Sequence, residues 1–78
     1  MLGASLKELR ERFNLPLSVV HERSKISISM LELIEADAFE ELPAEVYLRG
    51  FIKELLQLFG IQRLVDLDGY LSAYRAAR

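Results

Sequence analysis

The 78-residue chain contains no cysteine and a single histidine, and these absences exclude several classes of protein. A secreted domain of this size usually depends on disulfide bonds, so the lack of cysteine favours a reducing, cytoplasmic location. A metal site needs three or four ligands, and His21 has only Glu22 near it in the sequence, so we expect no metal ion. We interpret His21 as a partly buried residue that packs between helices.

Long apolar runs and catalytic motifs are missing as well. No run of about 18 apolar residues occurs, so no part of the sequence is predicted to span a membrane, and the first residues lack the features of a signal peptide. There is no glycine-rich phosphate loop, and the carboxylates fall at exposed helical positions without an apolar pocket that would raise a pKa. We therefore expect a binding module without cofactors, and not an enzyme.

What the sequence has in quantity is the apolar pattern of helices. Apolar residues make up 51% of the chain, which favours one folded domain over residues 1–78. The first helix shows the pattern in a stripe spaced by four, three and four residues, formed by Leu2, Leu6, Leu9 and Phe13. We predict an all-α bundle of five helices, at about residues 3–13, 16–24, 28–36, 46–59 and 64–76, with a loop over residues 36–45. The centre of the core is expected at Phe13, Leu31, Ile34 and Leu55.

Capping residues support these helix boundaries. Ser5 and Glu8 have the spacing of a capping box at the start of the first helix. Asn14 suits the end of that helix, because asparagine tolerates the left-handed backbone conformation found there. Either Ser27 or Ser29 can cap the third helix.

The second and third predicted helices, joined by a tight turn, have the outline of a helix-turn-helix, in which the start of the third helix reads DNA. A DNA-binding hypothesis uses Lys25, Ile28, Ser29 and Met30. Base edges are read mainly by arginine, lysine, asparagine and glutamine, and residues 27–48 contain none of these. The same segment carries six acidic residues and no basic one, which repels phosphate. DNA binding stays open but is disfavoured.

The apolar residues at the start of the third helix allow two interpretations. Ile28, Met30 and Leu33 either pack under the loop over residues 36–45, or they are exposed and form an apolar patch with an acidic rim. A patch of the second kind is typical of a protein interface.

The fourth predicted helix has an apolar face that covers about half of its circumference, which is more than one neighbouring helix needs. Tyr47 and Phe51 lie near one edge of this face and are candidates for either core or partner contacts. Arg49 is adjacent in the sequence and is either a solvated charge or a partner contact. We interpret Gly50 as a position where another backbone approaches closely.

Two segments resemble known families. Residues 15–27, with the sequence LPLSVVHERSKIS, resemble the second helix and turn of the lambda-repressor-like (XRE) family. Residues 30–61 are similar to the N-terminal cytoplasmic helix-turn-helix domain of the RodZ family of bacterial cell-shape proteins. The matching positions are Ile34-Glu35, Phe39, Leu42-Pro43, Val46-Tyr47 and Arg49-Gly50-Phe51-Ile52. The sequence departs from the family pattern at His21 and at Leu55-Leu56.

The RodZ resemblance covers residues 3–74 and implies a lambda-repressor-like fold of five helices. It also implies a protein partner, an actin-like filament of the MreB type, contacted through Phe39, Tyr47, Arg49 and Phe51. The expected function is thus protein binding in the bacterial cytoplasm. The alternatives are a DNA-binding regulator of the XRE type and an accessory module in a larger protein.

Overall fold

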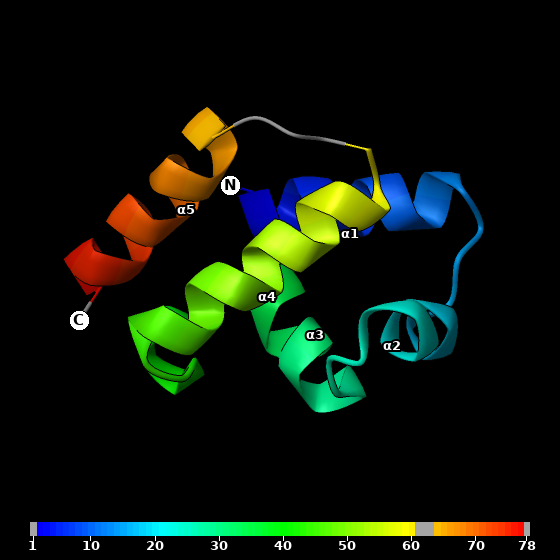
Figure 1. Cartoon of the computed structure of the whole chain (residues 1–78), viewed down its shortest axis with the longest axis horizontal. Coiled ribbons are helices and arrows are strands. Elements are labelled where there is room, and N and C mark those ends of the chain that lie inside the picture. Colours follow the sequence, from blue (N-terminus) through cyan, green and yellow to red (C-terminus); the bar gives the residue numbers. More distant parts are fainter. Residues whose placement is uncertain (1, 61–63, 78) are drawn as a thin grey trace.

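The structure, a computed structural model, describes residues 2–60 and 64–77. It confirms the predicted all-α bundle of five helices around a helix-turn-helix, and no strand occurs in the described residues. The helices are α1 (Leu2–Arg12), α2 (Leu17–Ser24), α3 (Ile28–Glu35), α4 (Glu45–Leu58) and α5 (Leu64–Ala77), with a 3-10 helix, η1 (Phe39–Glu41), before α4. Figure 1 shows α5 at one end of the molecule, the α2–α3 pair at the other, and α4 between them.

Most helix ends agree with the predictions, and the differences are at the start of α1 and in the loop before α4. Helix α1 already begins at Leu2, so Ser5 lies inside it and the proposed capping box is wrong. Asn14 has a φ of 56°, as its position at the end of α1 predicts. The cap of α3 is Ser27 and not Ser29, because the Ser27 hydroxyl accepts a hydrogen bond from the Met30 backbone N–H at 3.2 Å. The predicted loop over residues 36–45 contains the 3-10 turn of η1.

The core forms around α3 and the inner face of α4. Three of the four residues predicted at its centre are buried: Leu31, Ile34 and Leu55. Phe13 is 57% exposed, so its assignment to the core is wrong. The reason is that α1 ends at Arg12, and the chain turns away before the stripe reaches Phe13. The buried apolar residues are Leu6, Val20, Ile26, Leu31, Ile34, Leu42, Leu48, Ile52, Leu55, Leu56, Leu67, Tyr70, Leu71 and Tyr74.

The end of α3 is the point where α1, α3 and α5 meet. The buried Tyr70 hydroxyl of α5 donates a hydrogen bond to the Ile34 carbonyl oxygen at 3.1 Å. Burial, with the nearby Asp37 carboxylate, raises the pKa of Tyr70, which keeps this hydroxyl protonated and able to donate. On the other side, the Gly3 backbone N–H of α1 donates to the Asp37 carboxylate at 3.1 Å. A side chain at Gly3 would overlap the Ile34 carbonyl and the Asp37 carboxylate, so α1 can approach this closely only through glycine.

A partly buried ion pair joins α1 to α3. The Arg10 guanidinium donates to both carboxylate oxygens of Glu35, at 2.7 and 3.1 Å, and to the Leu15 carbonyl at 2.8 Å. Both side chains are nearly buried, and the hydrogen bond to Glu35 raises the pKa of Arg10. Because one guanidinium satisfies three acceptors, it fixes the α1–α2 turn relative to α3.

His21 differs from its sequence-based interpretation. The residue is exposed, and its Nδ1 lies 2.7 Å from the Ile26 carbonyl oxygen. Since a carbonyl oxygen only accepts, Nδ1 carries the proton and donates. His21 therefore closes the turn after α2 and does not pack between helices.

The core assignment leads to a prediction with an internal control. Leu31→Ala should lower the free energy of unfolding by about 2–5 kcal/mol, through lost apolar burial and the cavity left behind. Phe13→Ala removes a larger but exposed side chain and should change it by about 0.5 kcal/mol or less. Urea unfolding followed by circular dichroism measures both. Equal losses in the two variants would contradict the described end of α1.

The contact at Gly3 gives a second prediction. Gly3→Ala should destabilise the domain by about 1–3 kcal/mol, because the new methyl group meets backbone and carboxylate atoms. At Gly69, in α5, the same substitution meets no atom within 4 Å and should stabilise by about 0.5–1 kcal/mol through helix propensity. Thermal unfolding of the two variants checks the opposite signs. A rise in stability for Gly3→Ala would rule out the close contact between α1 and α3.

Candidate protein-binding surface

An open groove runs between the α2–α3 turn and the outer face of α4. Its volume is about 510 Å³, which lies in the range of ligand-binding clefts. We call it the α2–α4 groove, and its lining residues are Ser24, Lys25, Ile26, Val46, Tyr47, Gly50, Phe51 and Glu54. Most of the lining is apolar, with one basic and one acidic residue.

The α4 side of this groove follows from helical geometry. Val46, Tyr47, Gly50, Phe51 and Glu54 are spaced so that they share one face of the helix. The opposite face is buried in the core, so α4 is held from behind while this face remains open. Val46 is 75% exposed and Tyr47 is 63% exposed, whereas Phe51 is half-buried and packs against the core. The groove therefore combines a fixed aromatic wall with two exposed apolar side chains.

Arg49 does not lie on this face. At about 100° per residue, it is roughly 200° around α4 from Tyr47, and it does not line the groove. It lies on the flank near the exposed ion pair between Glu45 and Arg75, whose atoms are 2.6 and 2.7 Å apart. The hydrogen bond from Arg75, with a smaller contribution from Arg49, lowers the pKa of Glu45. Arg49 was predicted to contact a partner beside Tyr47 because the two residues are close in sequence. On the helix, however, the two side chains lie on different sides of α4.

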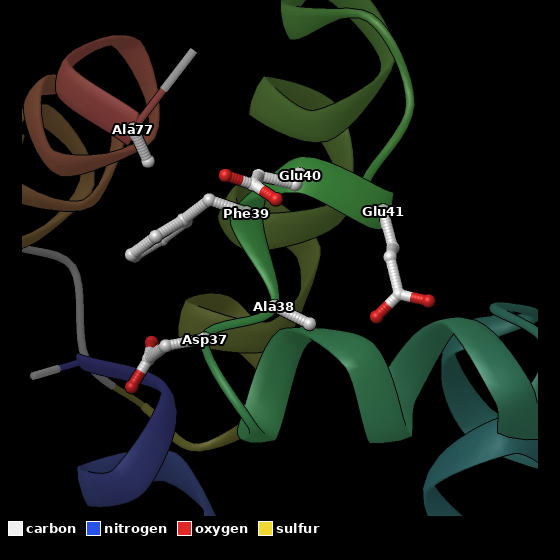
Figure 2. A pocket seen from close by; sticks show the side chains of 6 residues that line it. All are labelled: Asp37, Ala38, Phe39, Glu40, Glu41 and Ala77. Carbon is white, nitrogen blue, oxygen red and sulfur yellow. The ribbon is translucent and has the colours of Figure 1, made fainter.

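Phe39 lies in a separate hollow of about 360 Å³ between η1 and the end of α5. Figure 2 shows its ring directed toward α5, while Glu41 points to the other side of η1. The ring packs edge-on against Tyr70, with centroids 5.3 Å apart and planes at 69°. Phe39 therefore helps to hold α5 in place, and the four predicted partner contacts divide among three places. The hollow is lined by Asp37, Ala38, Phe39, Glu40, Glu41 and Ala77.

The four residues of the DNA-binding hypothesis lie on and after the α2–α3 turn. Lys25 ends α2 with a φ of 66° and lines the α2–α4 groove. Ile28 is 40% exposed and Ser29 is exposed. Met30 is half-buried and, like Leu33, packs against the core. Of Ile28, Met30 and Leu33, Ile28 is thus the one that is largely accessible. The exposed start of α3 therefore offers DNA bases one hydroxyl group, from Ser29, and one aliphatic side chain, from Ile28.

Sequence reasoning missed the contribution of the α2–α3 turn to the groove. Lys25 and Ile26 line the groove together with Val46 and Gly50, although about twenty residues separate the two pairs in the sequence. One signal was present, because Gly50 interrupts a helix without a visible reason. No other atom of this domain lies within 4 Å of a Cβ placed at Gly50, so the close approach predicted at this glycine is not made by another part of the described domain.

Comparison with known proteins identifies the class. A family model described as a helix-turn-helix domain matches residues 5–69, and the chain belongs to this helix-turn-helix family. Within it the chain is RodZ-like: it is 32% identical to the cytoskeleton protein RodZ of Streptococcus pneumoniae (strain ATCC BAA-255 / R6) over 69 residues, which are 88% of this chain. Those residues span 25% of that RodZ. No solved structure matches the chain.

Among residues 2–60 and 64–77, no helix has the length and apolar content needed to cross a membrane. Within the same residues, histidine and carboxylate side chains form no group of three that could hold a metal ion.

The composition of the helix-turn-helix leads to a prediction about DNA. We expect no sequence-specific DNA binding, because the exposed start of α3 lacks base-reading side chains and is followed by the acidic segment over residues 32–45. Selection from random duplexes at about 150 mM salt should return no consensus sequence. A consensus site bound at about 10⁻⁸ M or tighter, the usual range of specific readers, would contradict this expectation.

Proposed function

We propose that this domain is a non-catalytic, cytoplasmic protein-binding module that contacts an actin-like filament of the MreB type through the α2–α4 groove. The observation that supports it best is the exposure of Tyr47, 63%, beside Val46 at 75% on a fixed helix face. An exposed aromatic residue next to an apolar groove is typical of the centre of a protein interface, where tyrosine is enriched.

The choice of a protein over DNA rests on chemistry. The groove is lined by apolar side chains such as Ile26, Val46 and Phe51, which favour association by burial of apolar surface. Phosphate binding would instead require several cations, and among the residues that the structure describes Lys25 is the one cation that lines the groove. The acidic segment over residues 32–45 further disfavours an anionic partner.

The choice of a filament as the partner rests on the relatives. The similar protein from Streptococcus pneumoniae is a cytoskeleton protein, and the RodZ resemblance implies an MreB-type filament. A filament subunit is large enough to cover about 800 Å² of this domain, which is the usual share of one partner in a stable complex. Arg49 and Phe39 lie outside the groove, on the flank of α4 and on η1, and the proposed contact does not use them.

A single variant tests the binding surface. Tyr47→Ala should weaken binding to polymerised MreB of the same organism by about 2 kcal/mol or more, as expected for an interface anchor. Its melting temperature should change little, because the side chain contributes mostly exposed area. Co-sedimentation measures the binding, and circular dichroism measures the melting.

The matched control is Phe13→Ala, which removes another exposed aromatic side chain that does not line the groove. It should leave co-sedimentation unchanged. Equal binding by the folded Tyr47→Ala variant and the parent would exclude this surface. Absence of co-sedimentation of the parent domain at tens of micromolar would exclude the partner.

A further inference from the structure

Gly50 is a helical glycine that the fold itself does not require. It lies in the middle of α4, where glycine is about 1 kcal/mol less favourable than alanine. A Cβ there would have nothing within 4 Å, and its φ is not positive. Gly3 differs, since a Cβ at that position would collide with α3. The domain therefore carries a destabilising residue at Gly50 without an internal reason.

The location of Gly50 suggests what the missing side chain allows. The residue lines the α2–α4 groove beside the exposed Tyr47 and the half-buried Phe51. Tyr47 and Gly50 are three positions apart and are neighbours on one helix face. Because Gly50 has no side chain, the groove beside the two aromatic residues reaches down to the α4 backbone itself. A notch of this kind accepts a side chain from outside that a residue with a Cβ would displace.

The opposite wall indicates the charge of the occupant. Lys25 lies on the rim, and its side chain takes part in no ion pair found among the described residues. Lys25 ends α2 in the αL conformation. The groove also contains a carboxylate, Glu54, on the α4 wall, so its positive charge lies on the wall formed by Lys25, where an acidic group of a partner would find its complement.

We propose, resting on the function proposed above, that Gly50 is a specificity-determining notch: an apolar side chain of the filament subunit packs beside Tyr47 against the α4 backbone at Gly50, and an adjacent carboxylate of the subunit meets Lys25 on the opposite wall. The occupant is a protein segment, since the walls are apolar and a single cation serves a single carboxylate. Binding thus uses a small residue where the isolated domain would be more stable with a larger one.

The test fills the notch without harming the fold. Gly50→Leu should raise the melting temperature by several degrees, because leucine is a much better helix former than glycine and its Cβ meets no atom of the domain within 4 Å. The same variant should weaken co-sedimentation with polymerised MreB by about tenfold or more, because overpacking a close contact is unfavourable. Stability and binding then move in opposite directions, which a purely structural role of Gly50 does not produce.

Gly69→Leu is the matched control. Gly69 is also an exposed helical glycine with no atom within 4 Å of a Cβ, but it lies in α5 and does not line the groove. It should raise the melting temperature in the same way and leave binding unchanged. Lys25→Glu should weaken binding most strongly at low salt, as expected for a charge contact at a rim.

The outcomes separate the two proposals. Unchanged binding by Gly50→Leu, together with a loss in Tyr47→Ala, would overturn the notch and leave the proposed function standing. Unchanged binding by Lys25→Glu would overturn the carboxylate contact. If the parent domain does not co-sediment, both the proposed function and the notch are wrong.

Discussion

The buried end of α3 is the constraint on which the arrangement of the helices depends. At the Ile34 carbonyl, α1 approaches through Gly3 and α5 is attached through the Tyr70 hydroxyl. A carbonyl at a helix end has no partner within its own helix and must be satisfied from outside. The Ile34 carbonyl accepts both from the Asp37 backbone N–H at 3.1 Å and from the hydroxyl of a tyrosine 36 positions later in the chain. The Asp37 side chain in turn accepts from the Gly3 backbone N–H of α1, so the end of α3 joins α1 and α5 to the helix-turn-helix.

With the helices joined in this way, one face of α4 lies outside the core. The Arg10–Glu35 pair holds α1 and the following turn on α3, and α5 covers part of α4 from the other end of the bundle. Helix α4 buries Leu48, Ile52 and Leu55 against these elements. Its outer face adjoins the α2–α3 turn at the rim of the groove. The other helices are thus arranged around α3, and the outer face of α4, which does not contribute to the core, is available to a partner.

Helical periodicity predicted this scaffold well, because amphipathic stripes report local geometry. Leu31 and Ile34 were placed in the core by spacing alone, whereas Phe13 was misplaced because the stripe continues one residue past the helix. Contacts between distant segments left no periodic signal. The Arg10–Glu35 pair joins residues 25 positions apart, and the juxtaposition of Lys25 with α4 arises only after the turn has folded. The candidate groove therefore emerged from tertiary packing.

The segment that leads into α4 is held at both of its ends by α5. The Tyr74 hydroxyl donates to the Pro43 carbonyl at 2.7 Å, and the Arg75 guanidinium pairs with Glu45. The next residues along the chain are Val46 and Tyr47. The same two contacts therefore hold the last turns of α5 and the start of the exposed face of α4. Such support is reciprocal, because a free-energy coupling acts equally on both sites. We therefore expect that a partner that immobilises Tyr47 also stabilises the last turns of α5. Fraying of α5 should in turn make the α4 face that carries Tyr47 more mobile.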